Sequence, residues 1–219
     1  MGKLIVIEGL DGSGKATQSR LLCQRLEERG VLCKKVTFPD YDHESSAFVK
    51  LYLSGQLGSA EEVGAYAAST FFAMDRYVSY RLRWGADYQS GAVLVADRYA
   101  TSNATHQTSK LPREQWDEYL DWMEDYEYGK LGLPKPDLVI FLSVPIAISQ
   151  KLLEGRYEGD AAKKDIHEAD LQYLHRCYES AGYVAGRQGW HLLDCAPEGE
   201  LLSVEAISEK IWELVCKEI

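Results

Sequence analysis

A glycine-rich loop between a short apolar run and an amphipathic segment constrains the fold of this chain more than any other feature. The run at residues 3–8 reads KLIVIE, and GLDGSGK follows it at residues 9–15. From Lys15 onward, apolar side chains recur at helical spacing until Gly30. A β-branched run, a cluster of glycines and a 3.6-residue period predict a strand, a tight loop and a helix, in that order.

The rest of the chain alternates between further strand-like and helix-like segments. We predict strands at residues 34–38, 92–96, 138–142 and 190–193. We predict helices at residues 59–84, 112–127, 145–154, 168–188 and 204–218. Continuous apolar strands that alternate with helices are typical of a parallel sheet covered on both faces. The sequence therefore predicts an α/β fold, with residues 1–219 in a single domain.

The least apolar part of the chain, at residues 154–165, lies between two of the predicted helices and reads EGRYEGDAAKKD. One interpretation is an ordinary surface loop. The other is a segment that closes over a ligand, as such polar connections commonly do. We predict a lid over about residues 154–168.

Composition limits the partners of this chain. Its 24 Lys and Arg residues face 34 Asp and Glu residues, which gives a formal net charge of −10. This charge disfavours nucleic acid and anionic membranes as partners, because both would be repelled. We find no apolar run of the ~18 residues that a membrane helix needs, and no pattern of a signal sequence at the start, so we predict a cytoplasmic protein.

The cysteines do not form a recognisable framework. They are odd in number and contain no C-x-x-C pair, which argues against both a disulfide framework and a zinc site. We expect reduced thiols, packed mostly as small apolar side chains. The five positions are Cys23, Cys33, Cys177, Cys195 and Cys216.

Residues 9–15 match the first seven positions of the phosphate-binding pattern G-x-x-x-x-G-K-[ST]. Backbone N–H groups of such a loop converge on phosphate oxygens, the helix N-terminus adds a partial positive charge, and the lysine adds a full one. The sequence thus predicts a nucleotide phosphate site. Its candidate residues are Gly9, Leu10, Asp11, Gly12, Ser13, Gly14, Lys15, Ala16 and Thr17.

The eighth position of the pattern departs from the expected residue type. A Ser or Thr there would ligate Mg²⁺, but this chain has Ala16, and Thr17 is turned by about 100° along the helix. Two interpretations stay open. Either nucleotide oxygens, water and a carboxylate elsewhere hold the metal, or the protein binds a nucleotide without transferring a phosphoryl group.

Five motifs in order along the chain resemble those of thymidylate kinases. They are the loop with Asp11 at its third position, Phe38-Pro39, Phe72 with Arg76, Asp97-Arg98-Tyr99, and LPKPD at residues 133–137. The resemblance covers essentially the whole chain. It implies a three-layer P-loop kinase fold with a five-stranded parallel sheet flanked by helices. It also implies a homodimer that transfers a phosphoryl group from ATP, with Mg²⁺, to dTMP.

The resemblance also implies roles for residues around the dTMP. Phe72 and Arg76 lie four apart and share a helix face, where the ring stacks on thymine and the guanidinium donates to it. Asn103 reads the pyrimidine edge, and Arg98 clamps the acceptor phosphate. The candidate dTMP residues are Asp11, Phe38, Pro39, Phe72, Arg76, Arg98, Ser102, Asn103 and His106.

The metal and the transferring phosphoryl group need further residues. Asp97, at the end of a predicted strand, is the candidate metal ligand, directly or through water, and Glu168 is the second. Positions 10–14 hold no arginine, so we expect a lid cation to assist transfer: Arg156 first, then Lys163 or Lys164, which also join the ATP site. The candidate catalytic set is Asp11, Lys15, Arg98 and Arg156.

Alternatives remain at two levels. His106 stands where the family usually has Tyr or Phe near the deoxyribose, or it is a polar residue on a helix surface. The acidic segment at residues 114–127 is expected to be a solvated helix face with Trp116, Leu120 and Met123 turned inward.

For the whole protein, the alternatives are a deoxynucleoside kinase, which needs a carboxylate base, and a nucleotide-binding protein with little turnover.

Overall fold

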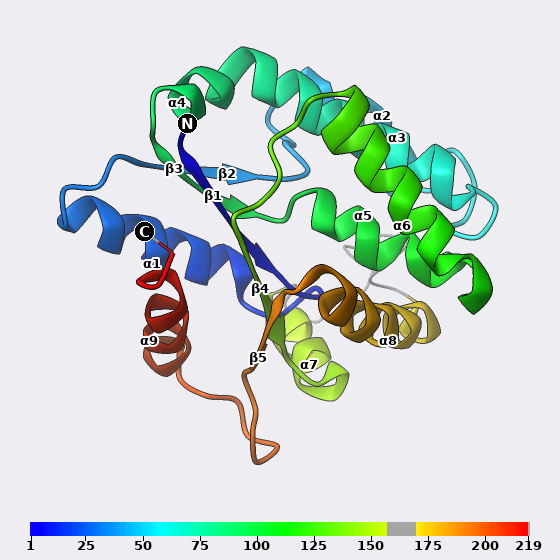
Figure 1. Ribbon diagram of the computed structural model, residues 1–219. Coiled ribbons are helices and arrows are strands. Elements are labelled where there is room, and N and C mark those ends of the chain that lie inside the picture. The colour runs from blue at the N-terminus through cyan, green and yellow to red at the C-terminus, as the bar shows by residue number, and fades with distance from the viewer. Residues whose placement is uncertain (157–169, 219) are drawn as a thin grey trace.

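The computed structural model describes residues 1–156 and 170–218, without the side chain of residue 156. A single parallel sheet of five strands forms its centre, in the order β2-β3-β1-β4-β5 (Figure 1). The strands are β1 (Lys3–Glu8), β2 (Cys33–Thr37), β3 (Val93–Asp97), β4 (Leu138–Ser143) and β5 (His191–Asp194). The predicted α/β class and five-stranded parallel sheet are confirmed, and each predicted strand boundary lies within one residue of the observed one.

Helices connect the strands. The longer ones are α1 (Lys15–Glu28), α3 (Ala65–Ser79), α7 (Ile146–Arg156), α8 (Leu171–Gln188) and α9 (Val204–Val215). The shorter ones are α2 (Ala47–Leu53), α4 (Gly85–Gln89), α5 (Ala100–His106) and α6 (Trp116–Glu124). Two π-helices follow α3 and α6 directly, η2 (Tyr80–Trp84) and η5 (Asp125–Lys130), and the 3₁₀ turns are η1 (Glu44–Ser46), η3 (Thr108–Lys110) and η4 (Arg113–Gln115).

Four predicted helices differ in extent from the observed ones, and one of them, at residues 204–218, ends at Val215. The predicted helix at residues 59–84 begins only at Ala65 and changes to a π-helix at Tyr80. The predicted helix at residues 112–127 divides into η4, α6 and η5. α8 is described from Leu171 onward. Helix α5 was not predicted, because its sequence ATSNATH has no apolar side chain larger than alanine to set a 3.6-residue period.

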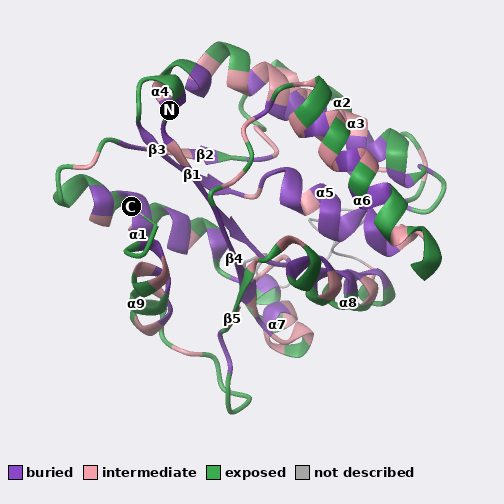
Figure 2. Ribbon diagram, viewed as in Figure 1, coloured by how far each residue is buried: buried purple, intermediate pink, exposed green. Residues whose placement is uncertain are grey.

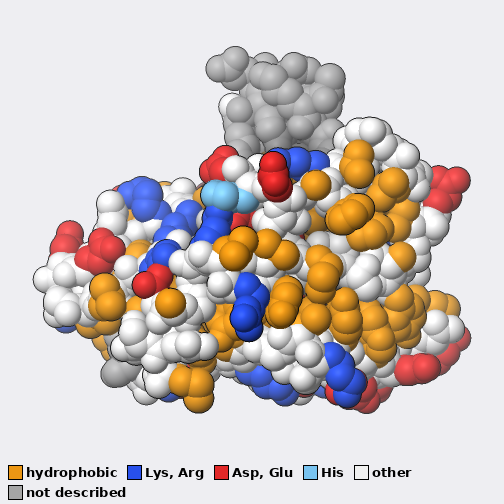
Figure 3. Space-filling model, turned by 90° about the horizontal axis from the view of Figure 1, so that it is seen from above, with side chains coloured by type: hydrophobic (Ala, Val, Ile, Leu, Met, Phe, Trp, Pro, Cys, Tyr) orange, Lys and Arg blue, Asp and Glu red, His pale blue; other side chains and the backbone are white. Residues whose placement is uncertain are grey.

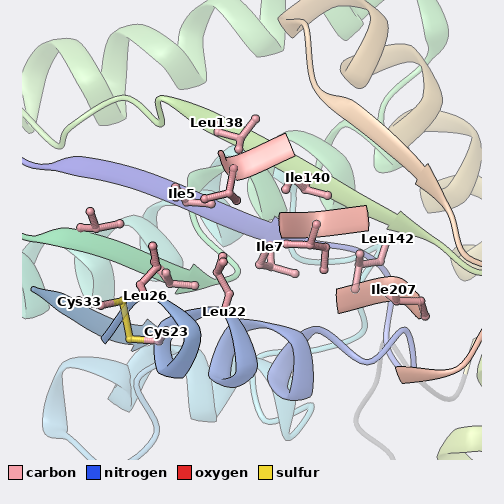
Figure 4. Packing of buried hydrophobic residues seen from close by; sticks show 14 of the residues in the cluster. Ile5, Ile7, Leu22, Cys23, Leu26, Cys33, Leu138, Ile140, Leu142 and Ile207 are labelled. Carbon is pink, nitrogen blue, oxygen red and sulfur yellow. A yellow bond between two sulfur atoms is a disulfide. The ribbon is translucent and has the colours of Figure 1, made fainter. Parts of the chain in front are cut away.

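The sheet separates two apolar layers, and Figure 2 shows its central strands β1, β3 and β4 buried between partly exposed helices. Alternate side chains of a strand point to opposite faces, so Ile5 and Ile7 pack on one side and Leu4 and Val6 on the other. Ile5 and Ile7 meet α1 and α9, as Figure 4 shows for the α1 side of the core. Covering both faces with helices gives the three-layer arrangement that was predicted.

The expectation that every cysteine is reduced is wrong for one pair. Cys23 on α1 and Cys33 on β2 form a disulfide (Figure 4). Their Cα atoms lie 5.7 Å apart, within the range that a disulfide spans, and this distance depends on the fold rather than on spacing in the sequence. Cys177 and Cys195 are free and buried, as expected, and Cys216 is free and exposed.

One side of the molecule carries exposed apolar side chains over α2, α3 and η2. Phe48 is 58% exposed and Leu82 is 76% exposed. Half-buried Phe71, Met74 and Val78 lie between them along α3. Figure 3, which looks down on this side, shows hydrophobic side chains gathered in a band. In the part of the chain that the structure describes, we find no helix long and apolar enough to span a membrane.

Candidate active site

The predicted phosphate-binding loop connects β1 to α1. Gly12 and Gly14 have φ angles of 79° and 86°, which glycine adopts readily and other residues rarely do. A Cβ on Gly12 would also lie 2.4 Å from the carbonyl oxygen of Ser149 on α7. Lys15, the first residue of α1, curls back so that its Nζ donates to the carbonyl oxygen of Leu10 at 2.8 Å. The loop thus has the backbone shape and the lysine that a nucleotide phosphate needs.

Burial lowers the pKa of Lys15 to about 8, although Asp11 and Asp97 act in the opposite direction. Phosphate oxygens near Nζ would favour the charged form. A bound phosphate would therefore raise the pKa of Lys15.

The residues near this loop fit a magnesium ion held mainly by a nucleotide. Asp97 ends β3, pairs in register with Ile7 just before the loop, and is buried at 3.9 Å from Nζ of Lys35. Mg²⁺ typically keeps several waters and takes one or two carboxylates in addition to phosphate oxygens. Ala16, in the first turn of α1, has no hydroxyl that could bind the ion. The carboxylate of Asp97 is the group at this edge of the sheet that could bind it instead. Among the described residues, no cluster of three or more His, Cys, Asp or Glu could bind a metal by itself, so the ion would need phosphate oxygens of a nucleotide as further ligands.

Arg98 is the centre of a polar cluster that faces the loop. Its φ of 66° makes it the only residue other than glycine with a left-handed backbone in the described part of the chain. Nη1 donates to Glu8 at 3.4 Å and Ser102 at 3.2 Å, and lies 3.2 Å from Nε2 of His106. Nη2 donates to Oδ1 of Asp11 at 2.5 Å. The cluster holds the guanidinium in one orientation beside the loop.

The charges in this cluster stabilise one another. Burial by itself raises the pKa of Asp11, but the Arg98 guanidinium and the Lys15 ammonium hold that pKa well below its usual range. Burial also lowers the pKa of Arg98, yet Asp11 and Glu8 raise it above its usual value overall. Asp11 is therefore a carboxylate and Arg98 a guanidinium at physiological pH.

A second polar cluster joins α3, α5 and η5. Arg76 is 1% exposed, and its Nε and Nη2 donate to the two carboxylate oxygens of Glu127 at 2.7 and 2.6 Å. Nδ2 of Asn103 donates to Oε1 of Glu127 at 2.7 Å and to the carbonyl oxygen of Ser69 at 3.1 Å. Phe72 lies one helical turn before Arg76, and its ring contacts Tyr52 edge-on. The cluster presents an aromatic ring, a guanidinium and an amide close together.

Residues of both clusters line one pocket of about 540 Å³, its open mouth included, with Glu8 and Glu127 behind its wall. All nine candidate dTMP residues contribute to its wall: Asp11, Phe38, Pro39, Phe72, Arg76, Arg98, Ser102, Asn103 and His106. Tyr41, Leu53, Tyr99 and Gln107 complete the lining. His106 is buried beside Tyr173 and Cys177 of α8, so the alternative of a surface histidine is wrong.

The candidate lid residues cannot be placed in this site. Lys163, Lys164 and Glu168 lie outside the described residues, as does most of the predicted lid. Arg156 ends α7, and its side chain also lies outside the described part. Their roles remain predictions.

Sequence reasoning missed two carboxylates of the site. Glu8 ends β1 and accepts from Thr101 at 2.7 Å and from Ser102 at 2.9 Å. Glu127 was expected on a solvated face, but it is buried, together with Leu120 and Met123. It comes seven residues after Leu120 and four after Met123, so helical spacing already indicated an inward position. Trp116 is half-buried rather than core.

This chain is similar to known proteins along most of its length. A family model described as thymidylate kinase matches residues 7–206. Thymidylate kinase of Mycobacterium tuberculosis (strain ATCC 25618 / H37Rv) is 30% identical over 189 residues, which cover 85% of this chain and 87% of that protein. Thymidylate kinase of Homo sapiens is 31% identical over 213 residues, which cover 96% of this chain and 88% of that protein.

A solved structure of thymidylate kinase from Candida albicans has a similar fold. It superposes with a TM-score of 0.72 and covers 99% of this chain and 92% of its own, at 21% sequence identity. At this identity, the similarity supports the fold, whereas the family model and the two relatives support common descent. The chain therefore belongs to the thymidylate kinase family.

Proposed function

We propose that this protein phosphorylates dTMP to dTDP, with ATP as donor and Mg²⁺ as cofactor. One observation carries the proposal: a single pocket beside the phosphate-binding loop is lined by Arg98, which pairs with Asp11, and by Arg76 and Asn103, which Glu127 joins. The first pair suits an acceptor phosphate, and the second suits the edge of a pyrimidine. Membership of the thymidylate kinase family supports the same reading.

The base end of the pocket provides complementary hydrogen-bonding groups. Nη1 of Arg76 makes no hydrogen bond among the described residues, and it can donate to O4 of thymine. Both hydrogens of Nδ2 of Asn103 are used by Ser69 and Glu127, so Oδ1 can accept from N3–H. Phe72 provides an apolar face for the ring.

The phosphate end positions the acceptor. Arg98 binds two oxygens of the dTMP phosphate, and Asp11 keeps the guanidinium aimed at the loop. The acceptor is already an ionised phosphate, so the reaction needs no general base. Holding the attacking oxygen close to the donor then supplies much of the rate.

The loop amides and Lys15 bind the ATP phosphates. Mg²⁺, when bound, neutralises charge on the donor phosphates during transfer. Asp97 would hold this ion, directly or through water, with Glu168 as a second carboxylate. Arg156, Lys163 and Lys164 are the lid cations that would cover the transferring group.

Two further properties belong to the proposal. The apolar side chains on α2, α3 and η2 supply the surface for a homodimer, because monomers rarely leave such a patch open to water. We also propose that the protein acts in the cytoplasm on small nucleotides, without binding nucleic acid or membranes.

A coupled assay that offers dTMP, dUMP, dCMP, AMP and thymidine with ATP and Mg²⁺ tests the function. We expect dTMP to be the preferred acceptor. Preference for thymidine would instead support a deoxynucleoside kinase, and an absence of dTMP turnover would contradict the proposal. The Ala16→Ser variant tests the remaining alternative, because activation from near zero would identify a binding protein with little turnover.

A further inference from the structure

We propose that Glu127 is a positioning residue that makes the pocket select a keto pyrimidine edge over an amino edge. It does so by fixing which atoms of Arg76 and Asn103 remain available to the base. This inference rests on the proposed function, because it concerns how that pocket recognises its base.

Glu127 is placed by an irregular stretch of helix. α6 ends at Glu124, and Glu127 lies in the π-helix that follows, with an exposed fraction of 0%. From there its carboxylate reaches Arg76 on α3 and Asn103 on α5. One side chain therefore connects the two elements that carry the base-facing groups.

The carboxylate fixes the orientation of the Asn103 amide. A carboxylate and a carbonyl oxygen only accept hydrogen bonds. Glu127 and the carbonyl of Ser69 therefore both require the NH₂ group of Asn103, at 2.7 and 3.1 Å. The amide cannot turn over without placing its oxygen against two acceptors, so Oδ1 is the atom left for a ligand.

The same carboxylate fixes the Arg76 guanidinium. Its two oxygens accept from Nε and Nη2, a bidentate pairing that holds the plane of the guanidinium. Nη1 is the remaining donor. Burial alone would lower the pKa of Arg76, but the Glu127 carboxylate raises it above its usual value, so the residue stays charged.

An acceptor on Asn103 and a donor on Arg76 match one pyrimidine edge and oppose the other. Thymine offers an N3–H donor and an O4 acceptor. Cytosine offers an N3 acceptor and an N4 donor, so each group would face a like group. A site built for one hydrogen-bonding edge rejects the reversed edge strongly, because buried polar groups are then left unpaired.

The Glu127→Gln variant tests this role with two nucleotides that differ only at this edge, dTMP and 5-methyl-dCMP. The Gln amide donates where one carboxylate oxygen accepted, so at least one of the three contacts becomes repulsive. An NH₂ in place of Oε2 opposes Nε of Arg76, and an NH₂ in place of Oε1 opposes both Nη2 of Arg76 and Nδ2 of Asn103. We expect the ratio of kcat/KM for dTMP to that for 5-methyl-dCMP to fall at least about tenfold, mainly through KM for dTMP. The KM for ATP should stay within about twofold, because Glu127 makes no contact with the phosphate-binding loop.

Asp75→Asn is the matched control. Asp75 is a second buried carboxylate, on α3, but its oxygens accept from the backbone of Asp40 and the hydroxyl of Ser45 and not from the side chain of Arg76 or Asn103. This variant should lower the melting temperature and leave the dTMP to 5-methyl-dCMP ratio unchanged. A Glu127→Gln variant that loses stability but keeps the ratio would show a purely structural role and overturn the inference.

A second variant and a binding measurement cover the remaining outcomes. If Glu127→Gln does not fold, Glu127→Asp keeps the charge but withdraws the carboxylate by one methylene, and we expect a smaller fall in the ratio; an unchanged ratio would overturn the inference. Calorimetric binding of both nucleotides gives the same ratio without turnover. A wild-type protein that does not phosphorylate dTMP contradicts the proposed function, whereas wild-type turnover with an unchanged variant ratio contradicts only the role of Glu127.

Discussion

At the scale of single residues, the cations of the pocket are held by carboxylates before any ligand arrives. Arg98 pairs with Asp11 and Glu8, and Arg76 pairs with Glu127. Removing one partner of a buried ion pair lowers the stability of the folded protein far more than replacing both partners does, because it leaves one buried charge without compensation. The pairs therefore orient the donors at a fixed geometry and leave selected donor atoms for the ligand.

Replacing Arg98 with alanine should reduce kcat/KM for dTMP by about 10²- to 10³-fold, because the acceptor phosphate loses its bidentate donor near the transferring group. Arg98→Lys should recover only part of the activity, since a lysine cannot donate in a fork. Steady-state kinetics with dTMP measure both. Arg113→Ala, at an exposed arginine stacked on Tyr183, is the control. Full activity in Arg98→Ala, with circular dichroism showing an intact fold, would remove the clamp role.

Lys15 should make ATP binding depend on pH. Its pKa is lowered to about 8 without ligand, and phosphate binding favours the charged form, so affinity falls as pH rises through 8. With Lys15 mostly charged at pH 7 and about one-tenth charged at pH 9, the Kd for ATP should rise about tenfold between them. Calorimetric titration across this range measures the change. A Lys15→Arg variant keeps its charge, so its profile should be flat, and an equally steep profile there would implicate another group.

At the scale of elements, the phosphate-binding loop is a place where glycine is required for two separate reasons. Gly12 and Gly14 both have a positive φ, which penalises any Cβ. Only at Gly12 would the Cβ also collide with backbone, that of Ser149 on α7. At Gly14, no atom beyond its chain neighbours and its own helix lies within 4 Å of such a Cβ. A substitution at Gly14 therefore tests backbone strain alone, whereas one at Gly12 tests strain together with close packing of the loop against α7.

Gly14→Ala should destabilise the protein by about 1 kcal/mol, the cost of a left-handed alanine. Gly12→Ala should cost clearly more, about 2 kcal/mol or above, because α7 must also move. It should also weaken ATP binding more than Gly14→Ala does. Urea denaturation and ATP titration of the two variants measure this difference. Equal effects in both variants would mean that contact with α7 does not constrain the loop.

The elements also show what a sequence can predict. The five strands were placed to within one residue. For the central strands β1, β3 and β4 the reason is that apolar runs such as KLIVIE and LVIFL must be buried on both faces. Helix α5 was missed because ATSNATH is polar and short, and its position depends on packing against α8. The Cys23–Cys33 pair was missed because pairing depends on where α1 and β2 lie relative to each other.

The residues of the candidate site also divide into those that local sequence predicts and those that depend on the fold. The pocket residues could be predicted because Phe72, Arg76 and Arg98 stand in motifs that resemble those of thymidylate kinases. Glu8 and Glu127 carry no motif, and only their contacts across the fold reveal them. Partners of a binding residue come from distant segments, so local patterns seldom indicate them.

At the scale of the whole molecule, the acidic excess and the anionic ligands are compatible because charge is distributed unevenly. The net charge is −10, yet Lys15, Arg76 and Arg98 all lie at the loop or the pocket, where the carboxylates beside them are already paired. Much of the remaining acid lies on surface helices such as α6. Long-range repulsion of a polyanion and local binding of a small nucleotide therefore operate in different places on the same protein.

The outward side of α3 leads to the last prediction, which concerns assembly. Phe48 stacks on Phe71, and Met74, Val78 and Leu82 continue the apolar stripe along α3 and η2. We expect a homodimer that buries this stripe, because an isolated monomer would leave it in water. The double variant Phe48→Glu with Leu82→Glu places charge in that interface and should give a monomer, as measured by light scattering coupled to size exclusion.

Leu32→Glu is the matched control for the dimer, since Leu32 is also largely exposed but lies between α1 and β2, away from the stripe. That variant should keep the wild-type mass. Both replaced side chains of the double variant are exposed in the monomer, so its melting temperature at low protein concentration should change little. A wild-type monomer at micromolar concentration, or a double variant that keeps the dimer mass, would show that α3 does not carry the interface.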